Sequence, residues 1–236
     1  MGGTTYEEEN MSTVIIIGGH GKVALRTAPL LIDAGHTVRS IIRKEEQAAD
    51  IRDTGAEPVV ADIASLSEDE LVDLFRGAGA VIWAAGAGGG DADATWAIDR
   101  DAAIRTMDAA EKAQVNRYVM VSYFNSRLVD GRVPGVSKDE GMYPYYNAKS
   151  QADEHLKNSR LDYTIVGPSA LNLDEPSGMI TVDNSGESAD LDVPETSRGN
   201  VAQVIAAALD EPEAVRKTIF FHDGDAPIAQ AVKTGH

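Results

Sequence analysis

The feature that most constrains the fold is a regular alternation of short apolar runs with segments whose apolar residues recur at helical spacing. Strands are predicted at residues 14–17, 36–43, 57–61, 80–84, 117–122 and 162–167. Helices are predicted between them, at residues 22–34, 45–54, 68–75, 94–113 and 144–158. Because strand and helix alternate along the chain, we expect a parallel sheet with helices on both faces, which is an α/β doubly wound fold.

The alternation stops after Gly167. Residues 168–195 are rich in Asp, Pro, Ser and Gly and are predicted to be irregular. They are followed by a predicted helix at 197–209, a strand at 217–221 and a short helix at 227–232. These pieces are too small for a core of their own, so we expect them to close one end of the sheet and cover its ligand crevice. The expected organisation is a disordered acidic tail (1–12) and one domain (13–236), with substrate-covering segments at about 123–143 and 168–236.

The first predicted strand leads into a glycine-rich turn in "VIIIGGHGKVA", residues 14–24. A triphosphate-binding Walker A loop needs glycine five residues before Gly21, where Ile16 stands. It also needs Ser or Thr after Lys22, where Val23 stands. The turn is therefore not a Walker A loop.

A dinucleotide-binding loop makes a different demand, which this turn meets. Gly18, Gly21 and Ala24 fit a G-x-x-G-x-x-[G/A] pattern, which supplies a tight turn, a close approach of backbone to pyrophosphate and a small residue for packing. The following helix then points its free amides at the pyrophosphate. Residues in this turn are predicted to bind the cofactor: Gly18, Gly19, His20, Gly21, Lys22 and Val23.

The end of the second predicted strand bears on which dinucleotide is bound. An NAD site usually has Asp or Glu there, on the ribose hydroxyls, whereas an arginine suits the 2′-phosphate of NADP. Arg43 and Lys44 stand at that end. The alternative is two solvated bases, and the neighbouring Glu45 and Glu46 oppose a phosphate. We predict NADP as the cofactor, with NAD as the alternative.

Composition narrows the class of partner. The formal charge is −17, from 21 Lys and Arg against 38 Asp and Glu, and such a surface repels nucleic acid and anionic lipid. The chain has no cysteine, which excludes disulfides, thiolate metal sites and a cysteine nucleophile, and its five histidines are too scattered for a metal site. No apolar run approaches the roughly 18 residues that span a bilayer. We expect a cytoplasmic monomer or homodimer with a small-molecule substrate, no metal, and neither nucleic-acid nor membrane partners.

With these motifs, residues 13–232 resemble the atypical short-chain dehydrogenase/reductase superfamily, in its small NAD(P)-binding branch related to flavin reductase and NmrA-like regulators. "GGHGKVA" resembles the glycine loop of that branch, with His20 in place of threonine. The resemblance implies a Rossmann fold, in which Asp62 and Ile63 of "ADI" line the adenine. It also implies cofactor contacts from the loop after the fourth strand and the turn after the sixth, namely Ala84, Ala85, Gly86, Pro168 and Ser169.

The chemistry of the superfamily depends on a Tyr-x-x-x-Lys pair, which "YYNAK" supplies as Tyr145 and Lys149. Residues i and i+4 share one helix face. The resemblance implies that Lys149 holds the nicotinamide ribose and that its charge lowers the pKa of the Tyr145 phenol, which passes a proton to a carbonyl. The family usually ends its fifth strand with two small hydroxyl residues, where this chain has Ser122 and Tyr123. Three alternatives remain: Ser122 polarises the carbonyl, Tyr123 replaces it, or the step is absent.

Two functions follow from these expectations. The first is an NADP-dependent oxidoreductase that transfers hydride between the nicotinamide and a small carbonyl, quinone or flavin-type acceptor, with Tyr145, Lys149 and Ser122 as catalytic residues. The second is a non-catalytic NAD(P)-binding sensor or regulatory protein of the NmrA-like type.

Overall fold

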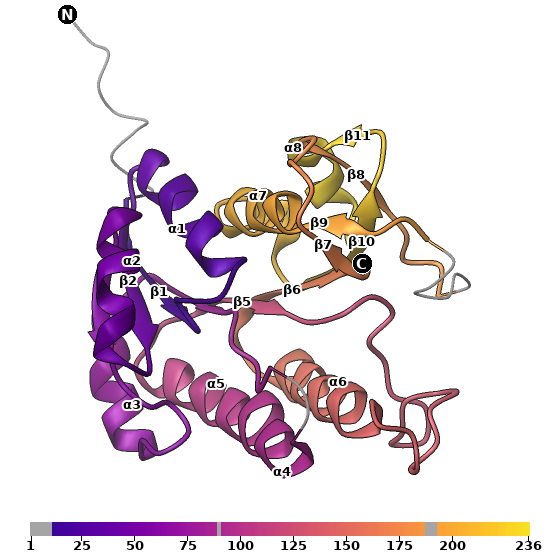
Figure 1. Ribbon diagram of the computed structural model, residues 1–236, viewed down its shortest axis with the longest axis horizontal. Helices are drawn as coiled ribbons and strands as arrows, with labels where there is room; N and C mark the ends of the chain where they lie inside the picture. The colour runs from indigo at the N-terminus through magenta and orange to yellow at the C-terminus, as the bar shows by residue number, and fades with distance from the viewer. Residues whose placement is uncertain (1–10, 89–90, 187–192) are drawn as a thin grey trace, which may run out of the picture.

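The computed structural model describes residues 11–88, 91–186 and 193–236. Within these residues one large sheet has the strand order β11-β8-β10-β6-β5-β4-β1-β2-β3 (Figure 1). Its strands are β1 (Thr13–Ile17), β2 (Thr37–Ile42), β3 (Glu57–Val60), β4 (Ala80–Trp83), β5 (Arg117–Val121), β6 (Asp162–Pro168), β8 (Met179–Val182), β10 (Lys217–Asp223) and β11 (Ala226–Pro227). A separate pair is formed by β7 (Leu171–Asn172) and β9 (Thr196–Ser197).

The sheet is parallel from β3 to β10, and β8 and β11 add an antiparallel margin. The first strand lies in its interior, where Ile15 pairs with Arg39 of β2 on one side and Val81 of β4 on the other. The outermost strands are β3 at one margin and β11 at the other. The predicted doubly wound α/β fold is therefore confirmed.

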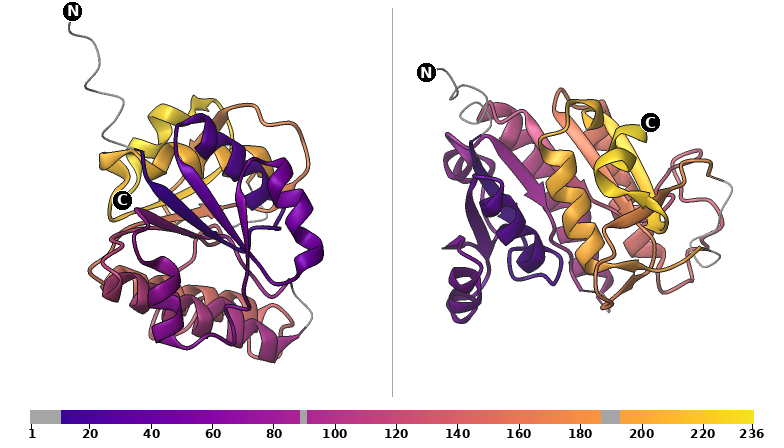
Figure 2. Two further views of the ribbon diagram at one scale, coloured as in Figure 1. Left: turned by 90° about the vertical axis from the view of Figure 1, so that its left-hand side faces the viewer. Right: turned by 90° about the horizontal axis from the view of Figure 1, so that it is seen from above.

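Helices cover both faces of the sheet, as the views in Figure 2 show. One layer contains α1 (Ala24–Asp33), α2 (Ala48–Asp53), α7 (Arg198–Leu209) and α8 (Ile228–Ala231). The opposite layer contains α3 (Glu68–Phe75), α4 (Ala92–Thr95), α5 (Ala103–Lys112) and α6 (Tyr143–Asn158).

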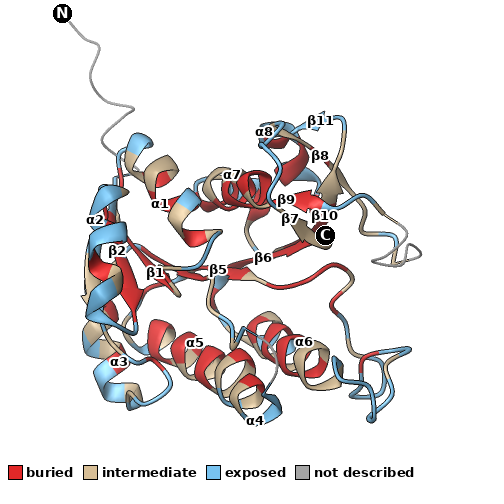
Figure 3. Ribbon diagram, viewed as in Figure 1, coloured by how far each residue is buried: buried red, intermediate tan, exposed pale blue. Residues whose placement is uncertain are grey.

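The core consists of two apolar clusters, one on each face of the sheet. Along β1, Val14 and Ile16 belong to the cluster under α1 and α7, whereas Ile15 and Ile17 belong to the cluster over α5 and α6. A strand buried on both faces reads as an unbroken apolar run, which is why the run could be assigned from sequence. Figure 3 shows this burial along the strands and on the inner sides of the helices.

Three predictions need correction. Residues 168–195 are not irregular throughout, because β7 and β8 lie there and β8 extends the main sheet. The predicted helix 94–113 is interrupted by a π-helical turn (Trp96–Ala102) between α4 and α5. Ser12, placed in the predicted tail, accepts a hydrogen bond at its carbonyl from the Thr37 amide (3.1 Å).

Some expectations concern residues that the structure does not describe. Most of the predicted tail, residues 1–10, and part of the predicted loop before α4, residues 89–90, lie outside the described residues. Within the described part of the chain, no helix is both long and apolar enough to cross a membrane.

Candidate cofactor and active site

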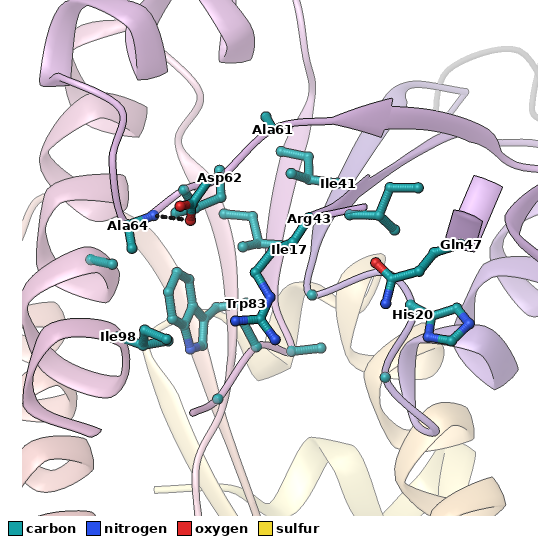
Figure 4. Close-up of a pocket in the computed structure, with 18 residues that line it drawn as sticks. Ile17, His20, Ile41, Arg43, Gln47, Ala61, Asp62, Ala64, Trp83 and Ile98 are labelled. Atoms are coloured by element: carbon teal, nitrogen blue, oxygen red, sulfur yellow. Dashed lines mark hydrogen bonds between the residues drawn. The ribbon is translucent and has the colours of Figure 1, made fainter. Parts of the chain in front are cut away.

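The strand order changes direction at β1, because β2 lies on one side of it and β4 on the other. In open α/β sheets the crevice at the carboxyl ends of such strands is the usual ligand site. A pocket of about 270 Å³ lies there, lined by the ends of all three strands (Figure 4). The predicted cofactor residues that line it are Gly18, His20, Gly21, Arg43, Asp62, Ile63, Ala84, Ala85 and Gly86.

The turn between β1 and α1 requires glycine. Gly18 has φ +81°, and a Cβ there would lie 2.6 Å from the Cα of Ala85. A Cβ at Gly19 would lie 2.6 Å from the Cβ of Ser40. The turn is therefore packed closely against β2 and against the loop after β4, where a side chain at either glycine would clash.

The N-terminus of α1 carries no side-chain group that would compete with a bound anion. The helix has no side-chain cap and no acidic residue in its first turn. By contrast, α3 has a complete capping box between Ser67 and Glu70, as its sequence predicts, and its first turn is acidic. The positive end of the α1 dipole is thereby left for a ligand, although the amides of residues 25–27 already donate to backbone carbonyls. These features fit a dinucleotide diphosphate.

Of the two predicted bases at the end of β2, only Arg43 lines the pocket. Figure 4 shows its side chain among the lining residues, and it forms no ion pair with the described residues. Lys44 is exposed, and its amide donates to Gln47 Oε1 (3.3 Å). His20 also lines the pocket, with Nε2 2.7 Å from Asp50 Oδ2. The pocket therefore offers one guanidinium to a phosphate.

Apolar side chains line the other side of the pocket. Ile63 and Trp83 line it, and Asp62 accepts a hydrogen bond from the Ala64 amide (3.2 Å). Trp83 is fully buried, and its Nε1 has no hydrogen-bond partner among the described residues. Our sequence analysis did not select Trp83, because a tryptophan at a strand end is typical of core packing.

Tyr145 and Lys149 lie on one face of α6, with Lys149 Nζ 5.8 Å from the centre of the Tyr145 ring. Lys149 is only 5% exposed. Its ammonium donates to the Val121 carbonyl (3.0 Å) and lies 3.6 Å from Asp99 Oδ1. The predicted pair is thus brought together, beside the end of β5.

Asp99 is a site residue that our sequence analysis missed. It lies in the π-helical turn and is 1% exposed. Its Oδ2 accepts a hydrogen bond from the Ala87 amide (3.0 Å), just after the pocket-lining Ala85 and Gly86. A signal was present, because Asp99 stands on the same helix face as the small residues Thr95 and Ala102, where a charge is out of place. Single turns of π-helix are frequent at functional sites.

The resemblance implies a lowered pKa for the Tyr145 phenol, but the structure gives the opposite direction. The pKa of Tyr145 is raised, first by burial and then by the negative charge of Asp99. The Lys149 ammonium itself contacts Asp99 and the Val121 carbonyl. The phenol therefore keeps its proton at neutral pH.

Ser122 and Tyr123 are both engaged in a buried network between β5 and α6. The Ser122 hydroxyl donates to Asp153, and the Ser126 hydroxyl donates to the same carboxyl oxygen (2.5 Å). The Tyr123 hydroxyl shares a hydrogen bond with Ser150 (2.7 Å). Burial raises the pKa of Asp153, although the two serine hydrogen bonds lower it. Neither hydroxyl belongs to the lining of the pocket.

The remaining predicted residues lie around the pocket rather than in its lining. Ser169, at the end of β6, is buried, and its hydroxyl donates to the Pro194 carbonyl (2.7 Å). Seven predicted cofactor residues are outside the lining: Gly19, Lys22, Val23, Lys44, Lys149, Pro168 and Ser169. Across residues 11–88, 91–186 and 193–236, no three His, Asp or Glu side chains gather as a metal site would require.

Comparison with known proteins identifies the family of this chain. A family described as NAD(P)H-binding matches residues 18–212. The chain belongs to this NAD(P)H-binding family. It is 34% identical to the uncharacterized sugar epimerase YhfK of Bacillus subtilis (strain 168) over 222 residues, 93% of this chain and 98% of that protein.

Solved structures of similar proteins share the fold of this NAD(P)H-binding chain. One is a Bacillus halodurans protein provisionally named an NAD-dependent epimerase/dehydratase, with TM-score 0.84 and 35% identity, covering 94% of this chain and 99% of that one. Another is the oxidoreductase ylbE from Lactococcus lactis, with TM-score 0.78 and 27% identity, covering 94% and 95%. The similarity thus spans nearly the whole length of each protein.

Proposed function

We propose that this protein is an NADP-dependent oxidoreductase that reduces a small carbonyl, quinone or flavin-type acceptor. The observation that carries the proposal is the position of Asp99. Its carboxylate binds the loop that lines the cofactor pocket through Ala87, and it also faces the ammonium of Lys149. This contact supports the proposal that the pocket and the Tyr145–Lys149 pair act as one site.

Each part of this site has a role in holding the cofactor. The turn between β1 and α1, at the positive end of the α1 dipole, would bind the diphosphate, and Arg43 would bind the 2′-phosphate. Ile63 and Trp83 would enclose the adenine, and Lys149 would reach the nicotinamide ribose. When bound, the nicotinamide supplies the hydride.

Tyr145 would supply the matching proton. Its phenol is protonated at neutral pH and would donate that proton to the substrate oxygen while the substrate carbon accepts the hydride. The acceptor is thereby reduced by two electrons and the cofactor is oxidised. Lys149 and Asp99 would set the charge around the phenol.

Replacement of Tyr145 by phenylalanine tests this proposal. With NADPH and a panel of aldehydes, quinones and flavins, we expect the wild type to oxidise NADPH and Tyr145→Phe to lose at least about 100-fold in kcat. Calorimetry should give both proteins the same affinity for NADP. Unchanged turnover in the variant would remove Tyr145 from the mechanism.

A second candidate, a non-catalytic NAD(P)-binding sensor, is favoured by one observation. The hydroxyls of Ser122 and Tyr123, which stand where the family has its carbonyl-polarising residue, are both engaged by α6. Binding of NADP without oxidation of NADPH by any acceptor in the panel would favour the sensor. An epimerase, as the name of the Bacillus relative indicates for that protein, would return the hydride and consume no NADPH.

A further inference from the structure

A second cavity, of about 340 Å³, shares no residue with the cofactor pocket. It lies between the segment after β5, the last turn of α6, the loop after β8, and β10. Its lining includes Ser126, Arg127, Lys157, Asn184, Thr218 and His236. No Asp or Glu is among the described residues that line it. In a chain with 38 acidic residues, such a lining is unusual.

Two cations of this cavity have no carboxylate partner among the described residues. Arg127 makes one hydrogen bond, from Nη1 to the Gly186 carbonyl (3.3 Å), and the Lys157 ammonium forms no ion pair within the described part of the chain. Among the described residues, a minority of the other Lys and Arg side chains are paired with a carboxylate. Ion pairs to carboxylates are formed by Arg39, Arg76, Arg100, Lys112, Lys149, Arg160 and Lys233.

The pKa of His236 responds to the positive charges that lie near the cavity. The pKa of its imidazole is lowered, first by burial and then by the positive charges of Lys157 and Lys217. The positive charges of Lys157 and Lys217 therefore act on this imidazole, although the whole chain carries −17. A neutral imidazole also leaves one N–H that can donate to a ligand.

We propose that this cavity binds the phosphate group of a small phosphorylated molecule, with Arg127 and Lys157 as the binding cations. A guanidinium offers a fork of donors that matches phosphate oxygens, and an ammonium adds a compact charge. Two unpaired cations balance a phosphate monoester, which carries about −1.5 to −2 at pH 7. The cavity exceeds the phosphate in size and leaves room for an organic portion.

The net negative charge of the chain disfavours nucleic acids and anionic membranes as the source of the phosphate. A surface with net charge −17 repels nucleic acid and anionic membranes at long range, whereas a small ligand responds to the local field. The proposal therefore concerns a soluble phosphomonoester. It does not depend on the proposed oxidoreductase function.

Inorganic phosphate, followed by proton NMR of the histidine side chains, tests the proposal. His236 lines this cavity and His20 lines the cofactor pocket, so one residue reports on each. Their signals can be assigned with His236→Gln and His20→Gln among the five histidines. At constant ionic strength maintained with chloride, we expect phosphate to shift the His236 signals saturably.

Charge-neutralising variants identify the binding groups. Arg127→Gln and Lys157→Gln should each weaken phosphate binding about tenfold, and the double variant should abolish the saturable shift. Lys138→Gln, which removes an exposed cation outside both pockets, should bind as the wild type does. A linear shift, a shift of His20 alone, or wild-type binding by the double variant would overturn the proposal. Because NADP binding is measured separately, failure here leaves the oxidoreductase proposal untouched.

Discussion

Arg43 is the residue on which cofactor preference depends. Arg43 and Lys44 are both exposed at the end of β2, but only Arg43 lines the pocket. The sequence could indicate a basic strand end, but it could not tell which of two neighbouring bases enters the pocket. That choice follows from the direction of each side chain at the end of the strand, where successive residues point to opposite faces.

Replacing Arg43 by glutamine should weaken NADP binding by about 10- to 100-fold, because a charge-assisted hydrogen bond contributes roughly 1.5–3 kcal/mol. The affinity for NAD, which lacks the 2′-phosphate, should change little. Calorimetric titration with both nucleotides measures the two effects, with Lys44→Gln as the matched control. Equal losses for NADP and NAD would contradict a 2′-phosphate role for Arg43.

At the scale of elements, a helix or strand could be predicted from the sequence when the residues that determine it are close together in the chain. The helix over residues 68–75 was predicted with its Ser67 cap, since the capping box is contained in four residues. The four-residue strand β8 was not predicted, because its pairing with β10 and β11 is determined by tertiary structure. The π-helical turn was missed for the same reason: Asp99 is stabilised there by contacts with distant segments.

The turn between β1 and α1 offers a test of close packing at the level of an element. Gly18 and Gly88 have the same φ of +81°, but a Cβ at Gly88 would meet no atom within 4 Å, whereas one at Gly18 would meet Ala85 at 2.6 Å. Gly88→Ala therefore adds backbone strain alone, of roughly 1 kcal/mol. Gly18→Ala adds a steric clash as well, and we expect it to lower the free energy of unfolding by about 2 kcal/mol more.

Urea unfolding of both variants, together with NADP titration, measures these effects. Gly18→Ala should also lose cofactor affinity, because the turn must move away from the loop after β4. Equal destabilisation by the two substitutions would show that the close approach to Ala85 is not important.

For the molecule as a whole, the distribution of charge matters more than its total. Most of the 38 acidic side chains face solvent, but Asp153 is completely enclosed between β5 and α6. Composition predicted an acidic surface, yet it could not predict an enclosed carboxyl, because burial depends on how the loop after β5 folds back onto α6. Such a group links the stability of the molecule to pH.

The sign of this linkage follows from the raised pKa of Asp153. Above its ordinary pKa of 3.8, the unfolded chain releases the proton while the folded chain keeps it, so stability falls as pH rises toward the folded-state pKa. Asp153→Asn should remove this contribution and make the slope of unfolding free energy against pH more positive. Urea unfolding over a pH series measures the slope, with the exposed Asp174→Asn as the control. An unaltered slope in Asp153→Asn would contradict a raised pKa.

The two outer strands of the sheet both contain proline, Pro58 in β3 and Pro227 in β11. Proline has no amide hydrogen to offer to a further strand, and such margins hinder the addition of strands from other molecules. Self-association by continuation of the sheet from one copy into the next is thereby disfavoured at either margin. If two copies pair, we therefore expect their contact at helix surfaces or loops.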